Sequence, residues 1–109
     1  MMLLSELLAK PITAFKDLDY VFHYFKPAST LAPYAVWIEQ NDDDMSADNQ
    51  KTERCLEGII DFYTPHEGDV RVDAIETALQ SMSASWKLTA VQFEEETQLI
   101  HYSWDWSVQ

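Results

Sequence analysis

Hydrophobic and polar residues alternate most regularly between residues 100 and 108. Five hydrophobic residues occupy every second position there: Ile100, Tyr102, Trp104, Trp106 and Val108. Because successive side chains of a strand point to opposite faces, this pattern predicts a strand with one apolar face. The preceding run, Trp86 to Phe93, is rich in β-branched and aromatic residues, and the polar segment Glu94–Glu96 separates the two runs. We therefore predict a C-terminal β-hairpin with an aromatic face.

Two other stretches have the spacing of amphipathic helices, in which apolar residues recur three and four positions apart. The first stretch contains Leu3, Leu4, Leu7 and Leu8, and the second contains Val72, Ile75, Leu79 and Met82. Pro11 is expected to end or bend the first helix. Asp69 or Asp73 can cap the second helix, and Glu76 stands at capping-box spacing from Asp73. A two-stranded ribbon cannot bury an aromatic face alone, so we expect the helices to cover it.

Three further segments are predicted as strands: Tyr20–Phe25, Tyr34–Glu39 and Glu53–Thr64. Gly58 is expected to mark a bulge or a close backbone approach. The acidic stretch Asn41–Asn49 is rich in residues that favour turns, so we predict a loop there. The order of elements predicts one α+β domain over residues 1–109, with a mainly antiparallel sheet of about five strands and two helices largely on one face.

The composition restricts the classes of function that the chain supports. It has 19 acidic and 7 basic residues, and a formal net charge of −12. This charge repels phosphate and disfavours binding to nucleic acid or to an anionic membrane. A single cysteine, Cys55, cannot form an internal disulfide and is interpreted as a small apolar strand residue. No segment has the length of a membrane span and no signal peptide is recognisable, so we expect a cytoplasmic protein.

Few residues could act in catalysis, and their spacing in the sequence matches no known catalytic motif. His101 and Asp105 are four positions apart along one strand, which is about 13 Å and too far for a hydrogen bond. The aspartates between residues 42 and 48 lack the glycine and the late glutamate of an EF-hand. We therefore predict no catalytic residue, no cofactor and no metal site. A small metal-dependent hydrolase or nuclease that uses Asp42–Asp48 is an alternative.

A succession of short motifs runs through most of the chain. In order, they are an aromatic strand ending in Phe25, Pro33-Tyr34 before Val36–Glu39, Ala47-Asp48-Asn49, Ile60–Thr64, Ile75-Glu76 in the second helix, and Glu94–Thr97 before Leu99–Tyr102. Their order and spacing resemble the small tail-terminator and tail-completion proteins of siphophages and prophages. Residues 10–19 show no family pattern, and the resemblance rests on the chain from Tyr20 to Val108.

The resemblance implies a structural role without catalysis. Such proteins form a homo-oligomeric ring on the head-proximal end of the tail tube, stop its polymerisation, and contact the head connector. They are assembled in the host cytoplasm and become part of the virion. The candidate assembly contacts, to the tube or to the next subunit, are Asp42, Asp43, Asp44, Asp48, Asn49, Glu94, Glu95 and Glu96.

Two other functions are compatible with the same sequence. One is a head–tail adaptor of the same virion, which would also be small and ring-forming. The other is an acidic inhibitor that mimics DNA, which would need carboxylates spaced along one surface like a row of phosphates. The acidic residues gather instead in one predicted loop and one hairpin tip. This distribution disfavours the DNA mimic.

Overall fold

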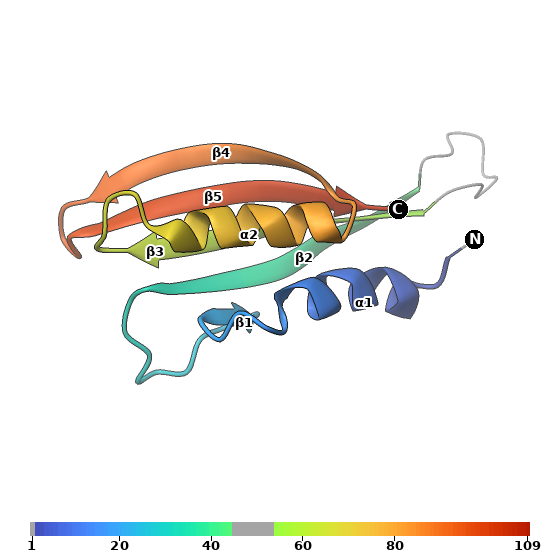
Figure 1. Cartoon of the computed structure of the whole chain (residues 1–109). Coiled ribbons are helices and arrows are strands. Elements are labelled where there is room, and N and C mark those ends of the chain that lie inside the picture. The colour runs from blue at the N-terminus through green and yellow to red at the C-terminus, as the bar shows by residue number, and fades with distance from the viewer. Residues whose placement is uncertain (1, 45–53) are drawn as a thin grey trace.

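The computed structural model describes residues 2–44 and 54–109 (Figure 1). The elements of this part of the chain are, in order, α1 (Leu4–Phe15), β1 (Val21–His23), β2 (Tyr34–Asp44), β3 (Arg54–Thr64), α2 (Val70–Ser81), β4 (Ser85–Glu94) and β5 (Leu99–Val108). The described strands form one sheet in the order β1-β2-β3-β5-β4. Strands β2 to β5 pair antiparallel, whereas β1 pairs parallel with β2. The predicted α+β class is confirmed, with a mixed rather than purely antiparallel sheet.

The predicted C-terminal hairpin is present as β4 and β5. Its register places Leu88 opposite Trp104 and Phe93 opposite Ile100. The apolar residues of β5 become more buried toward the end of the strand, where Trp104 and Trp106 are almost completely covered. The alternation in the sequence therefore identified both the strand and its inner face.

Both helices pack against this inner face, so the aromatic surface of the sheet is covered as expected. The buried residues form a single cluster, to which α1 contributes Leu7 and Phe15 and α2 contributes Ile75, Ala78 and Leu79. In Figure 1 the two helices lie side by side over the sheet, α2 in front of β3 and β5 and α1 nearer to β2. No element within residues 2–44 and 54–109 covers the other face of the sheet, on which Val36, Ile38 and Ile59 are half-buried.

The first helix is longer than predicted, because Pro11 does not end it. Helix α1 continues to Phe15, and Pro11 lies inside it. Its side chain and those of Leu7 and Phe15 are buried at spacings of four residues. Proline in a helix interior removes one backbone hydrogen bond, and here burial of the ring in the core offsets that loss. Leu3 and Leu4, in contrast, are exposed.

Two further predictions, one for β1 and one for the segment after Glu39, are corrected. The predicted strand Tyr20–Phe25 is shortened to Val21–His23, because Tyr24 has a positive φ of 73° and leaves the strand. The predicted loop Asn41–Asn49 is wrong over its first part, since the backbone of β2 pairs with β3 as far as Asp44. Pairing to a long neighbouring strand overrides the turn preference of these residues. The rest of that predicted loop lies outside the described residues.

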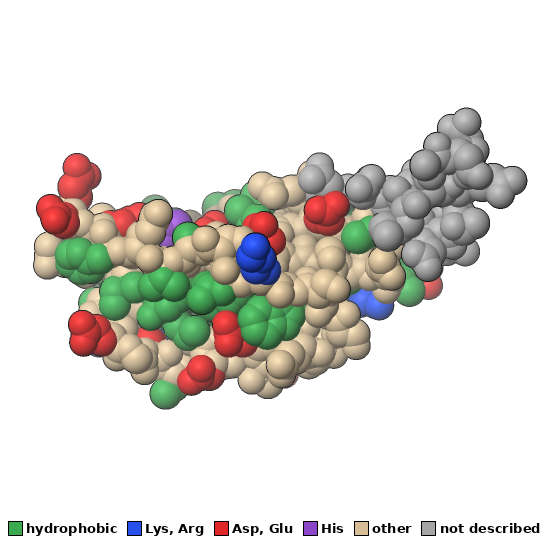
Figure 2. All heavy atoms as spheres, turned by 90° about the horizontal axis from the view of Figure 1, so that it is seen from above, with side chains coloured by type: hydrophobic (Ala, Val, Ile, Leu, Met, Phe, Trp, Pro, Cys, Tyr) green, Lys and Arg blue, Asp and Glu red, His purple; other side chains and the backbone are tan. Residues whose placement is uncertain are grey.

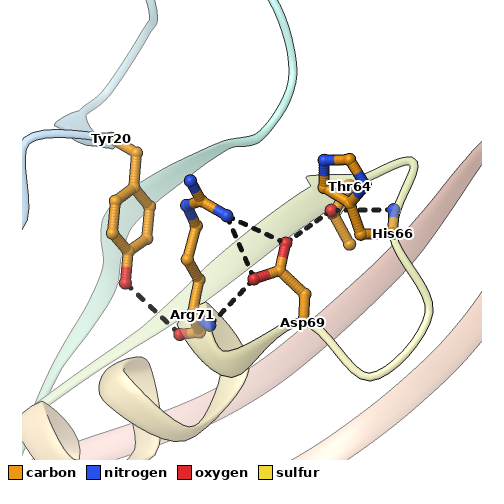
Figure 3. A network of polar contacts seen from close by, with 5 residues as sticks. All are labelled: Tyr20, Thr64, His66, Asp69 and Arg71. Carbon is orange, nitrogen blue, oxygen red and sulfur yellow. Dashed lines mark hydrogen bonds and ion pairs between the residues drawn. The ribbon is translucent and has the colours of Figure 1, made fainter.

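A polar network fixes the start of α2 (Figure 3). Asp69 caps the helix: its Oδ1 accepts from the Arg71 backbone N–H at 2.9 Å, and its Oδ2 accepts from Thr64 Oγ1 at 2.6 Å. The Tyr20 hydroxyl donates to the Arg71 carbonyl at 3.3 Å. Burial would raise the pKa of Asp69, but the hydrogen bonds from Thr64 and Arg71 outweigh burial and lower it. Asp69, and not Asp73, is the N-cap.

Candidate assembly surfaces

The two acidic segments predicted as contacts lie at opposite ends of the molecule. The described structure is elongated, with extents of 48 × 24 × 24 Å. Glu94–Glu96 lie at the tip of the β4–β5 hairpin, whereas the backbone of Asp42–Asp44 runs beside the start of β3 at the other end (Figure 1). The fold therefore does not bring the two segments together. Asp48 and Asn49 lie outside the described residues.

The hairpin tip holds two carboxylates in solvent on a well-defined turn. Gln98 has a positive φ of 60°, and its backbone N–H donates to the Glu94 carbonyl at 2.8 Å. Thr97 Oγ1 donates to Glu94 Oε1 at 3.2 Å, so Glu94 is engaged within the turn. Glu95 and Glu96 are exposed. The tip thus presents these two side chains as a compact negative surface.

Beside the tip, strand β4 exposes a row of apolar side chains that we name the β4 strip. It consists of Leu88, Val91 and Phe93, which are 40%, 54% and 57% exposed. A bulge at Thr89 shifts the register between Leu88 and Ala90, and this shift puts all three side chains on the helix-facing side of the sheet, beyond the edge that α2 covers. Figure 2 shows a band of hydrophobic side chains along this part of the molecule, with acidic side chains around it.

A groove continues the β4 strip toward the start of α2. It has a volume of about 500 Å³ and is lined by Pro65, Glu67, Val91, Gln92, Phe93 and Ile100. Strand β4 also lies at the edge of the described sheet, so its outer backbone groups have no strand partner within the described residues. An edge of ten residues with exposed apolar side chains is an association surface unless it is protected.

A second exposed apolar surface, which we name the β1 patch, lies at the opposite edge of the sheet. It consists of Tyr24, Phe25 and Leu31, which are 55%, 74% and 85% exposed. Lys26 lies over the ring of Tyr34 at 5.0 Å from its centre, so this edge also carries a positive charge. The two edges of the sheet therefore expose different apolar side chains.

Two histidines form carboxylate pairs that the sequence did not predict. Nε2 of His101 lies 2.8 Å from Oδ1 of Asp61 on the adjacent strand, and its Nδ1 lies 3.7 Å from Oε2 of Glu94. The imidazole stacks on Tyr63 with ring centres 4.3 Å apart. Burial raises the pKa of Tyr63 to about 12, so this phenol stays neutral in the physiological range. The cluster joins β3, β5 and the hairpin tip on the open face of the sheet.

The other pair lies beside the β1 patch. Nε2 of His23 is 2.7 Å from Oε1 of Glu39, and the Tyr24 hydroxyl donates to the second oxygen of Glu39. His23 is stacked between Tyr24 and Trp37, with ring centres 3.7 Å away on each side. Burial opposes ionisation of Glu39, but the hydrogen bonds from Tyr24 and His23 outweigh it and lower the pKa of this carboxyl. The stack fixes the backbone from which the β1 patch projects.

Both histidines are thus paired with a carboxylate rather than with a serine hydroxyl or the Cys55 thiol, and their partners are 40 and 16 positions away in the sequence. Among residues 2–44 and 54–109, no group of three or more histidine, cysteine, aspartate or glutamate side chains is arranged to hold a metal ion. No helix in this part of the chain is long and apolar enough to span a membrane.

The chain is similar to known proteins in structure rather than in sequence. No family model matches the chain, and no curated protein sequence matches it. Among solved structures, the chain is similar to a chain of the virion of a native gene transfer agent (GTA) particle, with a TM-score of 0.48 and 12% sequence identity. The match covers 95% of this chain and 91% of that chain.

Proposed function

We propose that this protein is a non-enzymatic structural subunit of phage tails, of the tail-terminator or tail-completion type. It forms a ring on the head-proximal end of the tail tube and joins the tail to the head connector. The motifs between Tyr20 and Val108 support this assignment. The observation that carries the proposal is the placement of two different apolar surfaces, the β1 patch and the β4 strip, on opposite edges of one sheet.

Opposite edges with different surfaces suit a head-to-tail contact between identical subunits. When one patch of a subunit meets a different patch of its neighbour, the contact repeats, and it ends when the rotation between subunits closes a ring. Contact between the β4 strip of one copy and the β1 patch of the next would bury apolar side chains that are 40% to 85% exposed in the single chain. A closed ring leaves neither edge free, so no further subunit can add.

The positions of the acidic segments suit a subunit that touches a different partner at each end. Because the hairpin tip and the β2–β3 end lie at opposite ends of the long axis, one can face the tube while the other faces the connector. The exposed carboxylates of Glu95 and Glu96 would meet basic groups on the partner. A ring of subunits with a net charge of −12 would also repel DNA, which could pass through without sticking.

The test is to mix the purified protein with tail tubes of the same virion and to examine the tube ends by electron microscopy. We expect a ring-shaped density on one end only, and capped tubes that no longer elongate when tube protein is added. Uncapped tubes that keep growing at saturating protein would contradict the proposal. Binding to isolated connector together with indifference to tubes would point to a head–tail adaptor instead.

A charge-reversal pair tests whether the hairpin tip is the tube contact. Glu95→Lys/Glu96→Lys should weaken tube binding by roughly tenfold or more, because two favourable charge contacts become repulsive. The control is Asp17→Lys/Asp19→Lys, which changes net charge equally at two exposed positions before β1. Tube binding is measured by co-sedimentation and folding by circular dichroism. An equal loss in both variants would show an effect of net charge alone and would exclude a specific contact at the tip.

A further inference from the structure

We propose that the free protein forms a two-fold symmetric dimer in which the edge strand β4 pairs antiparallel with β4 of a second copy. This inference uses the geometry of β4 and does not depend on the virion role. Strand β4 has ten residues and borders the described sheet on one side only, so its outer edge has no strand partner among the described residues.

The edge residues of β4 are regularly spaced in spite of the bulge. Leu88, Val91 and Phe93 lie opposite Trp104, Tyr102 and Ile100, which are every second residue of β5. The bulged residue Thr89 has no partner in the register with β5. The β4 strip therefore occupies three consecutive positions on one face of the paired strands, with Val91 in the middle. Lys87 and Glu94 flank the strip on the other face, opposite Asp105 and Leu99.

This arrangement is complementary to itself under a two-fold rotation about an axis perpendicular to the sheet that passes midway between the Val91 residues of the two copies. If Thr89 is left out when positions along β4 are counted, Leu88 lies opposite Phe93 of the second copy. Val91 then lies opposite Val91 of the second copy. The same rotation places Lys87 opposite Glu94 of the second copy, and this pair occurs twice. Directly opposed residues of an antiparallel pair share a face, as each of these pairs does.

The charges of β4 favour a second copy over an unrelated strand in this register. Lys87 is the one basic residue of β4, and the rotation sets it against an acidic residue that lies on the same face. The repulsion between two chains of charge −12 acts at longer range and is reduced beyond about 10 Å at 0.1 M salt. An isologous contact also closes with two copies, so the exposed edge is protected without growth into fibres.

Cysteine cross-linking tests the axis directly. In Val91→Cys the two introduced residues would face each other at the Cα separation of about 4.5–5.5 Å found in antiparallel pairs, which a disulfide can span. We expect rapid formation of a covalent dimer under mild oxidation, seen on a non-reducing gel. Two controls should give little product: the wild-type chain, which contains Cys55, and Gln92→Cys, whose two copies would be offset along the strand.

Charge reversal tests the register. Lys87→Glu alone and Glu94→Lys alone should each raise the dimer dissociation constant by roughly tenfold, because each creates two like-charge pairs per dimer. An equimolar mixture of the two variants should recover near wild-type affinity, since a mixed dimer regains both opposite-charge pairs. Molecular mass is measured by sedimentation equilibrium in the absence of tail tubes.

Three results would overturn the proposal: a monomeric mass at millimolar concentration, faster cross-linking through Gln92→Cys than through Val91→Cys, or failure of the mixed variants to recover. A basic peptide of alternating valine and lysine that binds β4 while the protein stays monomeric would identify a different occupant. Because these measurements contain no tubes, their failure leaves the ring proposal standing. Success would mean that the dimer has to separate before β4 can enter a ring.

Discussion

The indole ring of Trp106 on β5 lies directly against the backbone of Gly58 on β3. The two residues are opposite each other in the register of the sheet. A Cβ atom added to Gly58 would lie 2.2 Å from Cζ2 of Trp106 and 2.3 Å from the carbonyl oxygen of Ile38. The close backbone approach predicted for this glycine is therefore confirmed, and the absence of a side chain leaves the space that the indole ring occupies.

Substitution of Gly58 should be strongly destabilising. We expect Gly58→Ala to lower the free energy of unfolding by about 3 kcal/mol, because the ring and the β2 backbone both have to move away from the new methyl group. Urea denaturation followed by tryptophan fluorescence measures the change. The comparison is Gly68→Ala, at a φ of 63° with open space around it. Its cost of about 1 kcal/mol would come from the backbone alone, and a larger loss there than at Gly58 would contradict the packing argument.

The two buried tryptophans of β5 should respond differently to replacement by phenylalanine. Trp104 Nε1 donates to Oε2 of Glu76 on α2 at 2.9 Å, whereas Trp106 Nε1 is buried without an acceptor among the described residues. Trp104→Phe loses that bond and should cost about 2–3 kcal/mol of unfolding free energy. Trp106→Phe removes an unsatisfied donor and should cost about 1 kcal/mol. Equal costs in urea denaturation would show that the indole–carboxylate bond contributes little.

Acidification should weaken the cap of α2. The lowered pKa of Asp69 means that its contribution to stability is complete above the usual aspartate pKa of about 3.9 and disappears as pH falls through the folded value. At pH 7, Asp69→Asn should lower the free energy of unfolding by about 1–2 kcal/mol. Below the usual pKa this difference from wild type should shrink. Asp17→Asn at an exposed position is the control, and a gap for Asp69→Asn that stays constant with pH would contradict the assignment.

Elements with a regular pattern could be predicted from the sequence. The alternation from Ile100 to Val108 predicted both the strand and its inner face, and the spacing from Val72 to Met82 predicted α2. These segments could be predicted because each buries one face, and a buried face leaves a regular spacing of apolar residues in the sequence. The candidate contacts at Glu94–Glu96 were placed at a hairpin tip for the same reason. Whether they bind a partner is a property of two molecules, which one chain does not reveal.

Features that depend on distant segments could not be predicted. Proline indicates the end of a helix when only local backbone energy is considered, but Pro11 is held by the core that surrounds it. The strand character of Asp42–Asp44 comes from pairing with β3, and the parallel pairing of β1 comes from its position beside β2. The pairing of His101 with Asp61 joins residues 40 positions apart. In each case a tertiary contact outweighs the local preference.

The order of the strands also constrains when the sheet can form during synthesis on the ribosome. Strand β5 is the last described strand to emerge, yet it lies between β3 and β4 and pairs with both. Until β5 leaves the exit tunnel, β3 lacks one neighbour, β4 has no partner in the described sheet, and the aromatic side of the core is incomplete. The sheet therefore can be completed only after translation of β5, and during that interval the nascent chain exposes unpaired β4 and one free edge of β3 to chaperones.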